Sequence, residues 1–154
     1  MRKGDIRKAQ ILTVAERLFL SRGYLATTLA DILDEVGCTK GSFYHHFDSK
    51  YAVLDAIAAR RADRAFDAYR QGSAGDGLHK LNRLMYHALP FGREQRDFLA
   101  VLLALGDTPE GALVVRRLIG VLRLRFLPEL EQILAEMRAQ GTASYGSLPV
   151  AELV

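Results

Sequence analysis

Hydrophobic residues recur every three to four positions over most of the chain, which is the spacing of one face of an α-helix. Glycine, proline and small polar residues interrupt this spacing, and no segment shows the alternation of a β-strand. The pattern predicts an all-α protein whose helices cover approximately residues 5–21, 28–36, 39–47, 50–70, 78–88, 98–105 and 109–140. Pro128 lies inside the last of these helices, so we expect a kink over residues 124–128.

Capping residues define two short helices near the N-terminus. Thr28 is followed three positions later by Asp31, which is the spacing of a capping box. Gly37 is suited to the left-handed conformation that ends many helices, and Thr39 can cap the next helix. Ser49 can cap the fourth helix in the same way. The second and third helices are therefore predicted to form a helix-turn-helix.

The third helix has a dense group of hydrogen-bond donors. Phe43 and Phe47 are four residues apart, so they share the face that packs inward. A helix-turn-helix places the first residues of its second helix against the base edges of the DNA major groove. The face that is available for such contacts has Lys40, Tyr44 and either His45 or His46.

This segment resembles the N-terminal domain of the TetR family of transcriptional regulators. The resemblance rests on ATTLADILDEVGCTKGSFYHHFDSK at residues 26–50 and on ILTVAERLFLSRGY at residues 11–24, and it covers approximately residues 6–58. It implies an N-terminal three-helix domain that a long fourth helix joins to a helical domain for ligand binding and dimerisation. One departure is the run Ser49-Lys50-Tyr51-Ala52, which lacks the glutamate that often completes a capping box there in the family.

The expected domains are a DNA-binding domain at residues 1–50, with residues 50–70 as the connecting helix, and a second domain at residues 51–154. Family members usually continue into two further helices that pair with the partner subunit. Residues 141–154 are similar to the connection into such a helix, so we expect the second domain to be truncated before these two helices.

The resemblance also implies which residues contact DNA. Thr28 and Lys50 would hold phosphates on either side of the groove, and the first residues of the third helix would enter it. The predicted DNA contacts are Thr28, Thr39, Lys40, Gly41, Ser42, Tyr44, His45 and Lys50, with His46 as an additional candidate. Arg2, Lys3, Arg7 and Lys8 make the N-terminus basic, which is typical either of an arm that contacts the DNA backbone or of a solvated terminus.

In the family, the second domain binds a small molecule in an apolar pocket. In this chain, the residues that we expect to line such a pocket are Met85, Tyr86, Leu89, Phe91, Phe98, Leu102, Leu122 and Phe126. An apolar stripe at helical spacing is also what an ordinary helix core requires, so both interpretations stay open.

Composition narrows the possible functions. The net charge of +3 is compatible with nucleic-acid binding. The single cysteine, Cys38, excludes an internal disulfide and is either a small packed residue or a redox-sensitive thiol. His79 and His87 lack a third ligand, and the chain has no Ser-His-Asp order and no glycine-rich phosphate loop. We therefore expect no enzyme activity, no cofactor and no metal. With no signal peptide and no long apolar run, a cytoplasmic protein is expected.

Together these features predict a ligand-responsive repressor that binds a palindromic operator as a homodimer and that a small molecule releases from DNA. The alternative is a truncated helical module that acts by pairing with a full-length relative. We expect no membrane partner.

Overall fold

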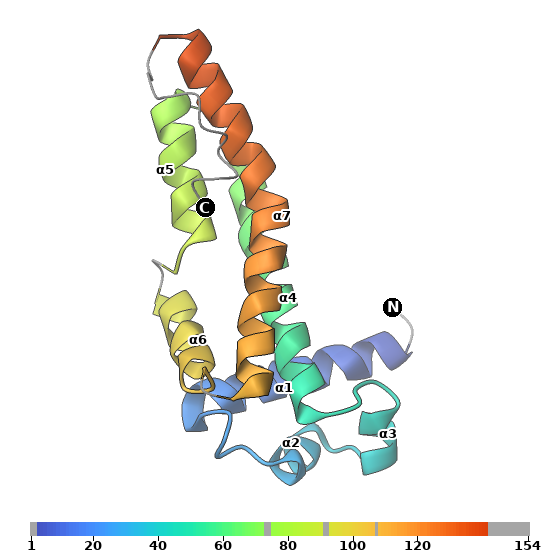
Figure 1. Cartoon of the computed structure of the whole chain (residues 1–154). Coiled ribbons are helices and arrows are strands. Elements are labelled where there is room, and N and C mark those ends of the chain that lie inside the picture. The colour runs from blue at the N-terminus through green and yellow to red at the C-terminus, as the bar shows by residue number, and fades with distance from the viewer. Residues whose placement is uncertain (1–2, 73–74, 91–92, 107, 142–154) are drawn as a thin grey trace.

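The computed structural model describes residues 3–72, 75–90, 93–106 and 108–141, and these residues contain seven α-helices and no β-strand (Figure 1). The all-α prediction is confirmed. The helices are α1 (Lys3–Arg22), α2 (Leu29–Val36), α3 (Lys40–Tyr44), α4 (Lys50–Gln71), α5 (Gly77–Ala88), α6 (Arg93–Leu103) and α7 (Pro109–Ala139). Compared with the prediction, α1 begins earlier and α3 is shorter, while α6 begins at Arg93, ahead of the apolar positions from Phe98 onward that predicted it.

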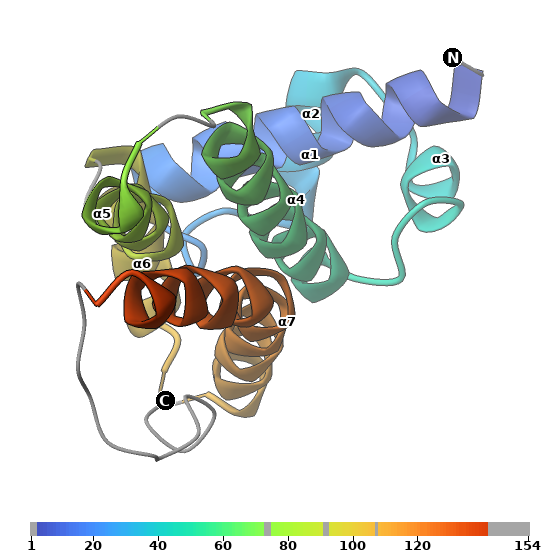
Figure 2. The same ribbon diagram turned by 90° about the horizontal axis from the view of Figure 1, so that it is seen from above.

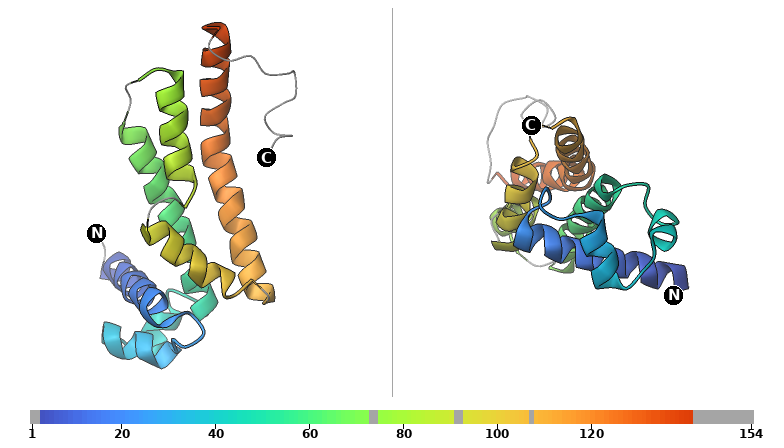
Figure 3. Two further views of the ribbon diagram at one scale, coloured as in Figure 1. Left: turned by 90° about the vertical axis from the view of Figure 1, so that its left-hand side faces the viewer. Right: turned by 90° about the horizontal axis from the view of Figure 1, so that it is seen from below.

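The helices are arranged in two parts. Helices α1 to α3 lie at one end of the molecule, at the bottom of Figure 1. From there α4 and α7 rise side by side in the same direction, and α5 runs in the opposite direction against both (Figures 1 and 2). Helix α6 lies below α5 and contacts both α1 and α7, so it closes the space between the two parts (Figure 3).

Two hydrophobic clusters stabilise this arrangement. The larger cluster joins side chains of α1 to α4 with side chains of α6 and the start of α7, among them Phe19, Leu54, Leu102 and Val114. The smaller cluster packs the far end of α4 against α5 and α7 and includes Tyr69. The larger core therefore runs across the boundary that we expect at residue 50, and the division into two domains stays a prediction.

Helix α7 stays helical through Pro128. Its ribbon is continuous in Figure 1, and the kink that we expect over residues 124–128 stays a prediction. Among the described helices, none has the length and apolarity that a membrane span requires. Four predicted features lie outside the described residues: Arg2 of the basic N-terminus, part of the break after α4, Phe91 of the predicted pocket, and the connection at residues 142–154.

Candidate nucleic-acid interface

The start of α2 is a complete capping box. The Thr28 hydroxyl oxygen accepts a hydrogen bond from the Asp31 N–H at 3.1 Å, and Asp31 Oδ2 accepts from the Thr28 N–H at 2.7 Å. The Thr28 hydroxyl also donates to Asp31 Oδ2 at 2.6 Å. These bonds to Thr28 lower the pKa of Asp31 below its ordinary value. Because its hydroxyl proton is held by Asp31, Thr28 must exchange this bond before it can donate to a phosphate.

The turn between α2 and α3 is a Schellman motif. Gly37 has φ +66° and ψ +47°, in the left-handed region that favours glycine. Its N–H donates to the Asp34 carbonyl oxygen at 3.3 Å, and the Cys38 N–H donates to the Leu33 carbonyl oxygen at 3.0 Å. Thr39 then caps α3 by accepting from the Ser42 N–H at 3.2 Å. The chain thus turns from α2 into α3 over residues 37–39, and these hydrogen bonds fix the turn.

Helix α3 is anchored by one face and exposed on the other. Phe43 is fully buried, and its ring centroid lies 6.0 Å from that of the buried Phe47. The next residue, Tyr44, is 52% exposed and contacts Phe43 edge-on at 5.5 Å. Lys40, Gly41 and His45 are also exposed, whereas Ser42 and His46 are half-buried. The structure therefore brings the predicted α3 contacts together on one short helix, and their contact with DNA stays a prediction.

Lys50 lies at the start of α4 and makes contacts within the protein. Its Nζ donates to the carbonyl oxygens of Tyr24 at 2.8 Å and Thr27 at 2.7 Å, and it lies 4.1 Å from the Tyr24 ring centroid. Burial lowers the pKa of Lys50, although Asp31 partly opposes this effect. Lys50 therefore ties the loop before α2 to α4, and its predicted phosphate contact would add to this role.

Three basic residues of the N-terminus, Lys3, Arg7 and Lys8, are part of α1. Arg7 donates to the Val36 carbonyl oxygen at 3.2 Å, and the Lys8 ammonium lies 5.6 Å from the Phe47 ring centroid. Both residues pack α1 against the helix-turn-helix. The sequence pattern gave no signal for these contacts, because they depend on how α1 crosses α2 and α3.

Sequence reasoning missed a buried charge cluster between α1 and α4. Glu16 is 9% exposed, and its two carboxylate oxygens accept from Arg60 and Arg61, each at 2.5 Å. A signal was present, because Glu16 follows Leu12 by four residues and precedes Phe19 by three, which places it on the buried face of α1. A carboxylate on that face requires cationic partners, and the cluster connects α1 to the middle of α4.

A second candidate site is an apolar cavity of about 240 Å³ between α4, α5, α6 and α7. Of the predicted pocket residues, Leu89, Phe98, Leu102 and Leu122 line it. The others lie elsewhere: Met85 and Tyr86 are exposed on α5, and Phe126 is buried in the smaller hydrophobic cluster. Ligand contact by any of these residues stays a prediction.

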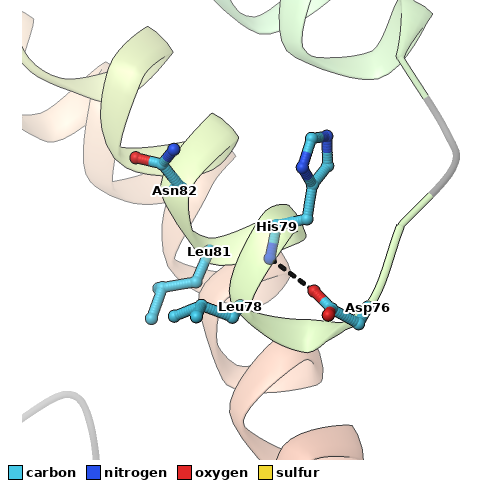
Figure 4. Close-up of a pocket in the computed structure, with 5 residues that line it drawn as sticks. All are labelled: Asp76, Leu78, His79, Leu81 and Asn82. Atoms are coloured by element: carbon cyan, nitrogen blue, oxygen red, sulfur yellow. Dashed lines mark hydrogen bonds between the residues drawn. The ribbon is translucent and has the colours of Figure 1, made fainter.

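A larger depression of about 630 Å³ lies at the start of α5 (Figure 4). Asp76 caps this helix by accepting from the His79 N–H at 2.8 Å. The described residues that line the depression lie between positions 76 and 82, on the cap of α5 and its first two turns. Within the part of the chain that the structure describes, no three His, Cys, Asp or Glu side chains are grouped so that they could hold a metal ion.

Comparison with known proteins agrees with this geometry. Residues 11–57 match the family model for bacterial regulatory proteins of the tetR family. The HTH-type transcriptional repressor KstR2 of Rhodococcus jostii is 45% identical over 65 residues, which cover 42% of this chain and 32% of KstR2. The matched segment thus spans about a third of that relative's length.

Solved structures extend the likeness along most of the chain. The TetR family transcriptional regulator PfmR of Thermus thermophilus is 29% identical, with a TM-score of 0.64 over 92% of this chain and 76% of PfmR. GusR of Salmonella enterica has the same fold at 22% identity, with a TM-score of 0.73 over 94% of this chain and 74% of GusR. Residues 11–57 thus match the helix-turn-helix segment of the TetR family, and the chain is similar in fold to a TetR family regulator over most of its length.

Proposed function

We propose that this protein is a DNA-binding transcriptional regulator whose helix α3 enters the major groove. The observation that carries the proposal is the division of α3 into a buried Phe43 and an exposed face with Lys40 and Tyr44. Lysine donates to phosphates and to guanine, and a tyrosine hydroxyl contacts phosphates. A function of this kind requires no catalytic step, and it places the protein in the cytoplasm, where bacterial DNA is found.

The finer proposal is a repressor that a small molecule releases from a palindromic operator. It is supported by the course of α4, which begins at Lys50 beside α3 and lines the apolar cavity through Arg61 and Ala65. A ligand that binds better to another position of α4 shifts the population away from the DNA-binding arrangement. In a dimer, such a shift changes the spacing between two recognition helices and weakens operator binding.

Association with another subunit is supported by exposed apolar side chains on α6 and α7. Leu103 is 68% exposed, Ile119 is 58% exposed and Leu124 is 80% exposed. A contiguous patch of such side chains marks a surface that binds other proteins, and we propose that these three belong to one patch. A second copy of this chain gives the homodimer that the operator model requires, whereas a full-length relative gives the alternative interaction module.

The test is selection of bound duplexes from a random DNA pool by the full chain at near-physiological salt. Enrichment of a palindrome supports the dimeric regulator, and the separation of its half-sites gives the spacing of the two α3 helices. Enrichment of a single half-site supports DNA recognition without a stable dimer. Binding that selects no sequence and disappears at higher salt contradicts the proposed regulator, because phosphate contacts alone carry no sequence information.

A further inference from the structure

The apolar cavity has an asymmetric set of polar groups. Among the described residues that line it, the side chains with polar atoms are Arg61, His87 and Gln95, and none is Asp or Glu. Burial and the charge of Arg83 lower the pKa of His87, so this imidazole is neutral at pH 7 and above. Arg61 is therefore the one permanently charged side chain on the described wall of the cavity, and it favours an anion over a cation when it turns from its carboxylate partner, Glu16, toward the cavity.

Arg61 connects the cavity to the DNA-binding helices. Its side chain is 15% exposed, and its Nη1 donates to Glu16 Oε1 on α1 at 2.5 Å. The Cζ atom lies 4.8 Å from the ring centroid of Phe98, which lines the same cavity from α6. The guanidinium group thus lies where α1, α4 and α6 meet, with Glu16 as its partner from α1 and the cavity beside it.

Arg60 provides a comparison within the same cluster. It donates from Nη2 to the other oxygen of Glu16 at 2.5 Å, but it is not among the residues that line the cavity. If Arg61 turns toward a ligand, Glu16 keeps Arg60 as a partner and is not left as an unpaired buried carboxylate. Breaking the Arg61–Glu16 contact in favour of a ligand is therefore less costly than breaking an isolated buried ion pair.

We infer that the cavity binds a small apolar carboxylate, and that the ligand's carboxylate takes Arg61 from Glu16. This inference rests on the proposed ligand-responsive regulator and adds the chemical class of the ligand and the contact through which it acts. The apolar part of the ligand packs against Phe98, Leu102 and Leu122. Loss of the Arg61–Glu16 contact weakens the connection between α1 and α4, which links cavity occupancy to the position of the helix-turn-helix.

The affinity of the full chain for octanoate and for 1-octanol tests this inference. These probes have the same chain length and differ in charge, and both are titrated by calorimetry at pH 8. We expect octanoate to bind about tenfold more tightly or better, since a charge-assisted bond to arginine is about twice as strong as a neutral one. Equal affinities, or binding of neither probe, would overturn the inference.

Three variants test which residues cause the preference for octanoate over 1-octanol. Arg61→Gln should bind both probes alike. Arg60→Gln removes the other arginine from the same carboxylate and should keep a smaller preference for octanoate, because Glu16 then has no second partner when Arg61 turns to the ligand. Glu16→Gln should bind octanoate more tightly than the unmodified protein, because the competing carboxylate is gone. Persistence of the preference in Arg61→Gln, or its loss only in Arg60→Gln, would contradict the inference.

Two further measurements keep the outcome interpretable. Thermal unfolding followed by circular dichroism shows whether each variant is folded, and Arg61→Lys retains a cation if Arg61→Gln does not fold. Binding to a selected DNA duplex is measured separately without ligand. A protein that binds DNA but shows no preference for octanoate contradicts the carboxylate inference alone, whereas a protein that selects no DNA sequence contradicts the proposed function.

Discussion

The ammonium group of Lys50 lies 4.1 Å from the centre of the Tyr24 ring and donates a hydrogen bond to the Tyr24 carbonyl oxygen at 2.8 Å. This relationship ties the segment between α1 and α2 to the first residue of α4. The helix that lines the apolar cavity is therefore attached to the loop that leads into α2, which is the contact through which we expect a movement of α4 to reach the helix-turn-helix.

Lys50→Met should destabilise the protein. The substitution keeps the length of the side chain but removes its ammonium group, so the carbonyl oxygens of Tyr24 and Thr27 lose a charged donor. Hydrogen bonds to charged groups contribute about 1.5–3 kcal/mol, so we expect the free energy of unfolding to fall by about 1–3 kcal/mol in urea titrations. Lys40→Met is the matched control, because Lys40 is exposed and its replacement should change stability by at most about 0.5 kcal/mol. Equal effects of both substitutions would contradict this role for Lys50.

Phe43 and Tyr44 are neighbours in the sequence but should contribute very differently to stability. Phe43 is fully buried, so Phe43→Ala should lower the free energy of unfolding by about 3–5 kcal/mol. Tyr44→Ala removes an exposed ring and one edge-on aromatic contact, which predicts a loss of at most about 1.5 kcal/mol. Chemical denaturation measures both values. A large loss in Tyr44→Ala would show that the tyrosine is part of the core, which the structure does not predict.

Gly111 and Gly120 should respond in opposite ways to alanine, although both lie in α7. A Cβ atom at Gly111 would lie 2.0 Å from the Leu105 carbonyl oxygen, which belongs to the backbone and cannot turn away. Overpacking of this kind costs about 1–3 kcal/mol, so Gly111→Ala should lower the melting temperature. A Cβ atom at Gly120 meets nothing within 4 Å, so Gly120→Ala should stabilise the helix by about 0.5–1 kcal/mol. Stabilisation by both substitutions would contradict the close approach between Leu105 and α7.

His87 should make stability depend on pH. Its pKa in the folded protein lies below the ordinary value of 6.5, chiefly because of burial and also because of Arg83. As the pH is lowered through 6.5, the unfolded chain therefore binds the proton more readily than the folded protein does. The free energy of unfolding then decreases until the folded His87 is also protonated. His87→Gln should reduce this fall in urea titrations between pH 7.5 and pH 5.5. An unchanged pH profile in the variant would assign the dependence to other groups.

Much of the fold follows from local sequence signals. Thr28, Gly37, Thr39 and Ser49 act within a few residues of their own positions, so the sequence alone predicts where α2, α3 and α4 begin or end. The spacing of Phe43 and Phe47 likewise predicts the buried face of the third helix. These features depend on backbone geometry near each residue, which is why one sequence is sufficient to predict them.

Other features depend on how the helices cross, which local patterns do not determine. The periodicity of α5 does not distinguish the exposed Tyr86 from a residue that lines the cavity, because the cavity position is set by α6 and α7. The pairing of Glu16 with Arg61 joins residues 45 positions apart. The contact of Lys50 with Tyr24 likewise requires the path of the loop after α1. These long-range contacts are the ones that link the cavity to the helix-turn-helix.

The most direct test of the proposed function is the affinity of α3 variants for a duplex selected by the unmodified protein, measured by fluorescence anisotropy. Lys40→Ala and Tyr44→Ala should each weaken binding by about tenfold or more while remaining folded, because each removes a donor from the face that we assign to the major groove. Arg93→Ala is the control, since it removes a positive charge from an exposed position on α6, away from α3. If both α3 variants are folded and bind as tightly as the unmodified protein, α3 does not contact the DNA and the proposed function is wrong.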